Sequence, residues 1–283
     1  MTKTRWIATT TTTLMLTAAL IGCSTNQQVA QDNHSAGSHA IDHTDSQDHA
    51  AKPTELKPVW QFSDEHPQAR QDTQVKFQLL DPTGSPLTQY DIVHEKRLHL
   101  IVVSADLNYF NHLHPDMQQA GLFTQTLNLP RGGRYKLIAD VTPTGQSASS
   151  YGQWIEVGGD ELALKPIQLD TDLTKTVAGQ QVTLQFDRAP QAGQETMMTF
   201  HFADATTQQP TTDLQPYLGA IGHVVALSAD AEQYLHVHPM EEKGSGPDAM
   251  FHIEFPKSGL YKIWGQFQRK GEVFIAPFVI RVP

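Results

Sequence analysis

An internal repeat limits how this chain can fold, because two copies of one pattern predict two domains of similar structure. Residues 99–115 align without a gap on residues 223–239. The match extends in both directions, since Phe77, Asp81, Pro130, Gly133 and Tyr135 recur as Phe200, Asp204, Pro256, Gly259 and Tyr261. We therefore expect one domain over 57–160 and a second over 161–283.

Each copy is predicted to be an immunoglobulin-like β-sandwich, so the fold class is all-β with two tandem domains. Apolar residues come in short alternating runs broken by Gly, Pro, Asp and Asn, and no helical period is sustained. About seven short strands per hundred residues is the immunoglobulin-like density. The expected strands are 75–80, 98–104, 110–114, 123–129, 135–141 and 153–157, then 182–186, 197–202, 223–228, 234–238, 251–255, 261–267 and 274–282.

The N-terminus has the layout of a lipoprotein signal peptide over residues 1–22. Lys3 and Arg5 precede a short apolar run at 14–21, which is too short to span a bilayer core of about 30 Å. Residues 20–23 resemble the lipobox, with Cys23 as the lipid acceptor, for example of palmitate. By the sorting rule of such proteins, Ser24 implies the outer membrane. We expect a membrane-anchored envelope protein on the periplasmic face.

A polar segment follows the anchor, over residues 23–56. It has hardly any large apolar residue, so it cannot offset its chain entropy by burial and is predicted to be a disordered tether. Histidines and aspartates alternate along it, a composition typical of loose metal capture, although a merely soluble spacer explains it equally well. The tether histidines are His34, His39, His43 and His49.

Composition excludes several functions. The formal net charge is −10, so nucleic acid is an improbable partner. Cys23 is the one cysteine, and its lipidation leaves no thiol for disulfides or cysteine-ligated metal sites. There is no nucleophile elbow, phosphate-binding glycine loop or zinc-protease helix, so we do not expect an enzyme.

The repeated histidines are the candidate site. Residues two apart on a strand face the same side, so His112 and His114 project together, and a turn at 104–106 folds His99 back toward them. Asp106 is a possible oxygen ligand or outer partner. The equivalent set in the second copy is His223, His236, His238 and Asp230.

Other interpretations of these histidines remain open at this stage. They could be retained for structure, for instance as hydrogen-bonding groups beside a strand-ending proline, or they could form an interface. Met117 and Met240 do not occupy aligned positions and are expected to fill gaps. The histidines without a counterpart in the other copy are left out of the site: His66, His94, His201 and His252.

A resemblance adds to this interpretation. The pattern His-x12-His-x-His-Pro, in particular residues 105–115, resembles a motif of uncharacterised bacterial secreted proteins and lipoproteins. Residues 256–282 look like the end of YtkA-like or FixH-like immunoglobulin-type domains. The resemblance implies copper or heavy-metal handling in the envelope, with no catalytic residues, although the methionine- or cysteine-rich ligand sets of better-defined copper carriers are missing here.

The sequence therefore predicts an envelope lipoprotein that buffers or delivers a divalent transition metal. Imidazole and carboxylate ligands suit copper, zinc or nickel, with copper highest in affinity. Envelope metal transporters or chaperones would be its partners. The alternative is a structural or interaction lipoprotein without metal, whose tandem domains bind an envelope protein or polysaccharide.

Overall fold

The structure, a computed structural model, describes residues 55–160, 163–237, 239–240 and 243–283. The predicted signal peptide, Cys23, the tether histidines and His238 lie outside these residues. The described residues, from 55 onward, belong to one compact unit. Within the described part of the chain, no helix is long and apolar enough to cross a membrane.

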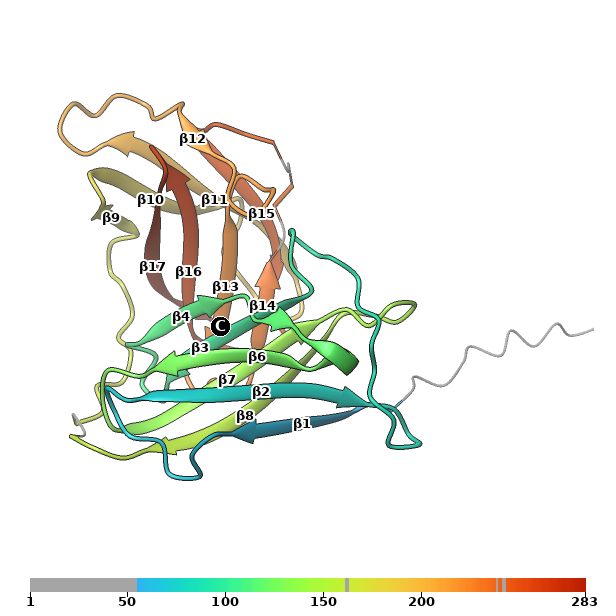
Figure 1. Cartoon of the computed structure of the whole chain (residues 1–283). Helices are drawn as coiled ribbons and strands as arrows, with labels where there is room; N and C mark the ends of the chain where they lie inside the picture. Colours follow the sequence, from blue (N-terminus) through green and yellow to red (C-terminus); the bar gives the residue numbers. More distant parts are fainter. Residues whose placement is uncertain (1–54, 161–162, 238, 241–242) are drawn as a thin grey trace, which may run out of the picture. The chain divides into compact units, whose positions relative to one another are not determined.

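The first copy forms two four-stranded antiparallel sheets, with strand orders β1-β2-β6-β5 and β4-β3-β7-β8. In Figure 1 it runs from blue to yellow-green. One short 3₁₀ helix, η1 (Gln119–Gly121), lies between β5 and β6. The strands are β1 (Lys57–Phe62), β2 (Asp72–Leu80), β3 (Leu98–Ser104), β4 (Phe110–Leu113), β5 (Asp116–Met117), β6 (Phe123–Asn128), β7 (Gly133–Val141) and β8 (Ser149–Val157).

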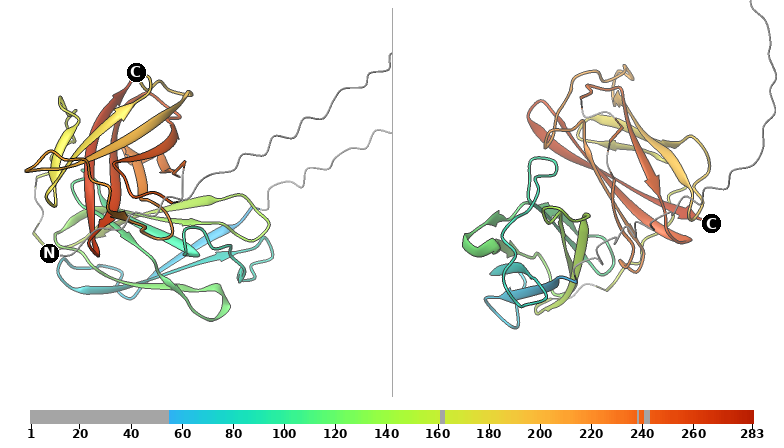
Figure 2. Two further views of the ribbon diagram at one scale, coloured as in Figure 1. Left: turned by 90° about the horizontal axis from the view of Figure 1, so that it is seen from above. Right: turned by 90° about the vertical axis from the view of Figure 1, so that its right-hand side faces the viewer.

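The second copy repeats this plan with the sheets β15-β11-β10-β9 and β12-β16-β13-β14, where β17 also pairs with β16. Its strands run from yellow to red in Figures 1 and 2. They are β9 (Thr174–Val177), β10 (Gln180–Phe186), β11 (Glu195–Asp204), β12 (Leu214–Gln215), β13 (His223–Ser228), β14 (Tyr234–Val237), β15 (Asp248–Glu254), β16 (Gly259–Arg269) and β17 (Glu272–Val282).

The predicted fold class is confirmed: the described part of the chain is nearly all-β, with two repeated immunoglobulin-like sandwich domains. Alternation explains the packing, since Val75, Phe77 and Leu79 of β2 are buried while the residues between them are more exposed. These side chains meet Leu98 and Leu100 of β3 in one core, so the two sheets of the first copy face each other. The second copy has its own core, rich in phenylalanine.

Strands β3 and β13 are buried on both faces, and this double burial positions the candidate site. Leu100 and Val102 belong to the core of the first copy, whereas Ile101 and Val103 belong to a third cluster that also contains Val225 of β13. This third cluster, here called the junction core, consists of Ile101, Val103, Leu107, Ile138, Val225, Leu227, Ala231 and Trp264. The two copies therefore pack together through equivalent sheet faces.

Candidate metal centre

The β3–β4 hairpin brings three histidines of the first copy together at the edge of the junction core. Ile101 pairs with His112, and Leu100 pairs with Leu113, so His99 lies opposite His114, the residue just after β4. One ring nitrogen from each of His99, His112 and His114 lies within 4.8 Å of the others. We call these residues the first triad. Their convergence is the arrangement that the histidine spacing predicts.

Hydrogen bonds fix the protonation of two rings in the first triad. A carbonyl oxygen only accepts, so the contact of 3.0 Å with the Val93 carbonyl places a proton on His99 Nε2. His112 Nδ1 lies 2.6 Å from Gln266 Oε1 and donates to it. The two remaining nitrogens, His99 Nδ1 and His112 Nε2, are 3.0 Å apart. Both then present lone pairs with no proton between them.

Facing lone pairs in a buried place are unfavourable unless a cation binds both. His99 and His112 are only 3% and 7% exposed, so water does not screen them. Two nitrogens bound to one ion at about 2.0–2.1 Å, at roughly a right angle, lie about 2.9 Å apart. The observed 3.0 Å matches that spacing. His114 Nε2 is also buried, and it has no hydrogen-bond partner among the described residues.

The second copy repeats the same chemistry with a different third member. His223 Nε2 lies 2.9 Å from the Tyr217 carbonyl and donates to it, which leaves a lone pair on Nδ1. That Nδ1 is buried without a hydrogen-bond partner in the described part of the chain. His223, His236 and His94 each offer a nitrogen within 4.8 Å of the others. We call them the second triad.

His94 belongs to the second triad, contrary to the expectation that it lies outside the site because it lacks a counterpart in the other copy. It lies in the turn closed by the Val93–Lys96 bridge, and the Tyr217–Ala220 bridge closes the equivalent turn. His94 (φ 47°) and Leu218 (φ 51°) take the same left-handed conformation at matching positions. The turn of the first copy thus carries an imidazole to the triad of the second.

Reciprocal contacts tie the two triads to each other across the junction. His112 donates to Gln266 of the second copy, and His236 Nδ1 lies 2.7 Å from Asp140 Oδ2 of the first. Asp140 pairs with His99, and Gln266 pairs with His223, so the two acceptors are equivalent positions. The Asp140 carboxylate can only accept a hydrogen bond. By equivalence, the side-chain oxygen of Gln266, and not its amino group, accepts the hydrogen bond from His112. These contacts orient His112 and His236 in the same way.

Two lysines, one buried (Lys136) and one half-buried (Lys262), repeat the reciprocal pattern. Lys136 Nζ donates to the Ala231 carbonyl at 2.7 Å, and Lys262 Nζ donates to the Leu107 carbonyl at 2.8 Å. Lys136 also pairs with Glu232 Oε1 at 2.9 Å. Because each contact joins one copy to the other, the junction is a two-fold-like interface with matched hydrogen bonds and an apolar centre.

Burial keeps four of the triad imidazoles neutral. Desolvation is the main cause that lowers the pKa of His99 to about 4, that of His114 to about 4 and that of His223 to about 3. The pKa of His112 is well below its usual range for the same reason. Hydrogen bonding from His236 helps to hold the pKa of Asp140 below its usual value, against desolvation. At neutral pH, His99, His112, His114 and His223 are thus neutral nitrogen donors.

Metal-free protein should lose stability as the pH falls from about 6.5 to about 4. In that window the unfolded chain binds protons at His99 and His223 that the folded chain does not bind. Each such group changes the free energy of unfolding by up to about 1.4 kcal/mol per pH unit. Urea unfolding at several pH values measures this slope. His223→Gln should reduce it and His252→Gln should not; a flat profile between pH 6.5 and 4.5 contradicts the prediction.

Asp106 and Asp230 lie away from both triads, which corrects the expectation that they are oxygen ligands. Asp106 follows the end of β3 and Asp230 follows the end of β13, whereas the triad histidines of these strands lie at their starts. Asp106 accepts from Ser104 Oγ at 2.6 Å and from the backbone and side-chain nitrogens of Asn108. Asp230 accepts from Ser228 and from the backbone of Glu232 in the same way. Both carboxylates stabilise the hairpin turn.

Asp106→Ala should therefore lower the free energy of unfolding by about 1–2 kcal/mol and leave metal affinity unchanged. The carboxylate would take its turn hydrogen bonds with it, while the histidines of the first triad would keep their positions. Chemical denaturation and metal titration of the same preparation check both parts. Asp230→Ala is the matched variant in the second copy. A tenfold loss of metal affinity in either variant would restore the ligand role.

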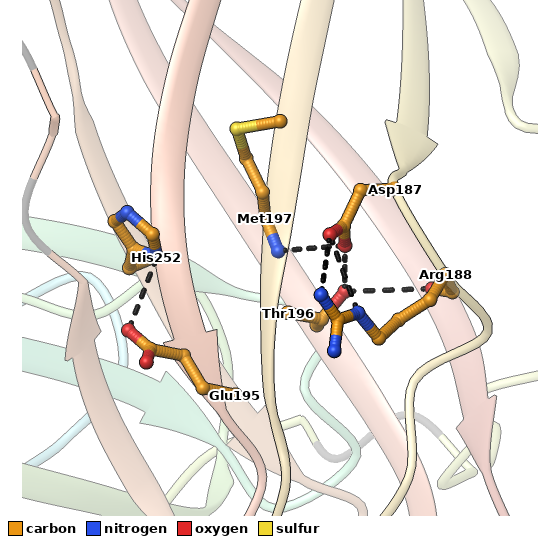
Figure 3. Close-up of polar contacts among 6 residues, drawn as sticks. All are labelled: Asp187, Arg188, Glu195, Thr196, Met197 and His252. Atoms are coloured by element: carbon orange, nitrogen blue, oxygen red, sulfur yellow. Dashed lines mark hydrogen bonds and ion pairs between the residues drawn. The ribbon is translucent and has the colours of Figure 1, made fainter.

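The remaining histidines and methionines in question lie outside the triads. On the surface, His201 Nδ1 pairs with Asp248 Oδ1 at 2.6 Å. His252 Nδ1, also on the surface, pairs with Glu195 Oε1 at 3.1 Å (Figure 3). The His66 backbone nitrogen donates to Asp64. Met117 packs against the core of the first copy, and Met240 is 47% exposed. His201 and His252 thus provide control positions.

A cavity gives access to the triads. It has a volume of about 140 Å³ and is bordered by His99 of the first triad, His236 of the second and Asp140. Lys96 and Arg97 also border it, so it carries positive charge at its wall. A small ligand in this cavity would lie next to both triads.

Comparison with known proteins agrees with the two-copy organisation. Residues 57–157 and 175–283 each match the family described as Domain of unknown function (DUF8832). The finer resemblance to YtkA-like or FixH-like domains stays a prediction. Among curated proteins, none matches this sequence significantly.

Three solved structures show the range of structural similarity. The Escherichia coli adhesin FdeC aligns at 17% identity over 81% of this chain and 66% of its own, with a TM-score of 0.29. The Yersinia pseudotuberculosis adhesin InvE aligns at 13% over 80% and 60%, with a TM-score of 0.25. A Salmonella alpha-2-macroglobulin aligns at 10% over 82% and 15%, with a TM-score of 0.28. The chain spans less than two thirds of each.

Proposed function

We propose that this chain, which belongs to the family described as Domain of unknown function (DUF8832), binds a divalent transition metal through the histidines where its two copies meet. The family description names no activity, so the proposal depends on geometry. The observation that carries it is the contact of 3.0 Å between His99 Nδ1 and His112 Nε2, whose other nitrogens both donate to oxygens.

Copper is the metal that the donor set favours. All the converging ligand atoms are imidazole nitrogens, which suit copper, zinc and nickel, and copper(II) binds most tightly of these to a given nitrogen site. With three nitrogens for each triad, a further coordination position stays open. An open position and an access cavity fit reversible loading and release better than permanent structural retention.

The cellular role follows from the proposed anchor. A chain lipidated at Cys23 would hold its metal at the outer membrane, where it buffers the ion or passes it to envelope transporters or chaperones. The tether histidines would collect ions loosely and the triads would hold them firmly. We propose no enzymatic activity for this site.

The test is metal binding by the full chain. Equilibrium dialysis against copper(II), followed by metal analysis, should show firmly bound copper. The variant His99→Ala/His112→Ala/His114→Ala should hold less of it, because only the second triad remains. His201→Ala/His252→Ala is the control, because it removes two surface histidines. Circular dichroism establishes that each variant is folded, and the single change His114→Ala serves if the triple variant is not.

Equal copper content in the triad variant and the control would overturn the proposal. It would favour the alternative, a structural or interaction protein whose buried histidines only hold the junction together. Loss of copper in the triad variant alone supports the proposal, since the tether histidines are the same in both variants and the control removes two surface histidines instead.

A further inference from the structure

We infer that the two triads form one dinuclear centre, in which two ions lie side by side at the junction and His94 of the first copy is a ligand of the ion held by the second. This inference depends on the proposed metal binding and makes it more specific. It also assigns a role to the junction, because the second triad is complete only when both copies are packed together.

Distances between rings support one shared centre. Within the first triad, ring centres are 4.6–5.1 Å apart. Between the triads, His99 lies 5.1 Å from His236 and 6.2 Å from His223. The imidazoles of different triads are therefore about as close as those of the same triad. Rings this close are compatible with two ions held side by side, as in two-metal sites, where the ions lie about 3.5–4 Å apart.

The ligand sets are nevertheless separate. The nitrogens of His99, His112 and His114 form one group within 4.8 Å, and those of His94, His223 and His236 form another. Each group offers three nitrogens, the usual protein ligand number of a metal site with an open position. One ion shared by all the rings would need six nitrogens about 2 Å from one point, and the grouping of the nitrogens favours two ions.

The two sites are expected to differ in affinity. His112 donates to the neutral amide of Gln266, whereas His236 donates to the carboxylate of Asp140. A carboxylate that accepts from a ligating imidazole raises its basicity, and loss of such a partner costs about 10–100-fold in metal affinity. The second triad should therefore fill first, and Asp140→Asn should narrow the difference between the two binding constants.

The centre should also take a small anion. Two divalent ions would bring four positive charges, and the carboxylate of Asp140, which contacts His236, offsets one of them. The cavity of about 140 Å³ touches both triads, and Lys96 and Arg97 at its wall favour negative charge there. A hydroxide or halide from solvent would fit between the ions and complete both coordination spheres.

The experiment is a copper(II) titration of a full chain whose tether histidines are changed to Ala, followed by electron paramagnetic resonance. We expect two firmly bound ions for each chain and a spectrum dominated by spin coupling between them. His94→Leu installs the residue found at the equivalent position, Leu218. It should leave one ion with the spectrum of isolated copper(II), and His252→Leu should leave two coupled ions.

The outcomes separate this inference from the proposed function. Two ions with the full intensity of isolated copper(II), a single ion, or unchanged coupling in His94→Leu would each overturn the dinuclear centre while metal binding stands. No firmly bound ion would overturn the proposed function itself.

Discussion

Copper(II) should raise the free energy of unfolding by about 4 kcal/mol for each bound ion when its free concentration is a thousand times the dissociation constant. The effect is large because the ligands converge only in the folded chain, where burial holds His99 and His223 neutral and ready to bind. For a protein of this size, about 1 kcal/mol corresponds to roughly 2–4 °C in Tm. One ion should therefore raise Tm by roughly 8–16 °C.

Thermal unfolding followed by circular dichroism, with and without copper(II), measures this shift. Zinc(II) provides a redox-inert comparison and should stabilise less, in line with its lower affinity for imidazole sites. The variant with alanine at His99, His112 and His114 should keep only the contribution of the second triad. If it shifts as much as the unchanged protein, the stabilisation comes from other histidines and the prediction is wrong.

The fold was largely predictable because its strands alternate. The expected strand 98–104 coincides with β3, whose run of apolar residues is buried on both faces. Strand β1 was missed, since its residues are exposed or half-buried and leave little period-two signal. Strands β9 and β12 were also missed, because they are too short to show an alternation of apolar and polar residues in the sequence.

The first triad was predictable because a single hairpin builds it. Once the turn at 104–106 is recognised, the register that brings His99 to His112 and His114 is local. Asp106 was expected as a possible oxygen ligand or outer partner, but its place in the turn puts it at the far end of β3 from His99. The spacing Ser104-x-Asp106 is itself a turn signal and indicated the structural role.

The second triad could not be predicted, because its third member comes from the other copy. His94 was left out because it has no counterpart in the other copy. In a duplicated chain, however, a histidine present in only one copy can be a ligand that this copy alone supplies. Asp140 was also missed. Its signal was present, since a carboxylate stands in the apolar strand 135–141 directly opposite His99, with Gln266 at the matching position.

Trp264→Ala should separate the two roles of the junction without removing any histidine. Trp264 is 3% exposed in the junction core, and its ring stacks on Phe110 of the first copy with centres 4.6 Å apart. Truncation of a buried aromatic residue costs about 3–5 kcal/mol. Because this loss weakens the contact between the copies, His94 should no longer reach His223 and His236, and copper content should fall from two ions to one.

Trp60→Ala is the matched control. Trp60 packs on Phe77 with ring centres 4.7 Å apart, within the first copy and away from the junction core. It should lower the free energy of unfolding while both ions stay bound. Urea unfolding and metal analysis of the two variants give the comparison. The first triad is built by one hairpin, whereas the second triad spans both copies. A centre that depends on the junction therefore predicts loss of one ion in Trp264→Ala and of none in Trp60→Ala. Two retained ions in both variants would show that the triads do not depend on how the copies pack.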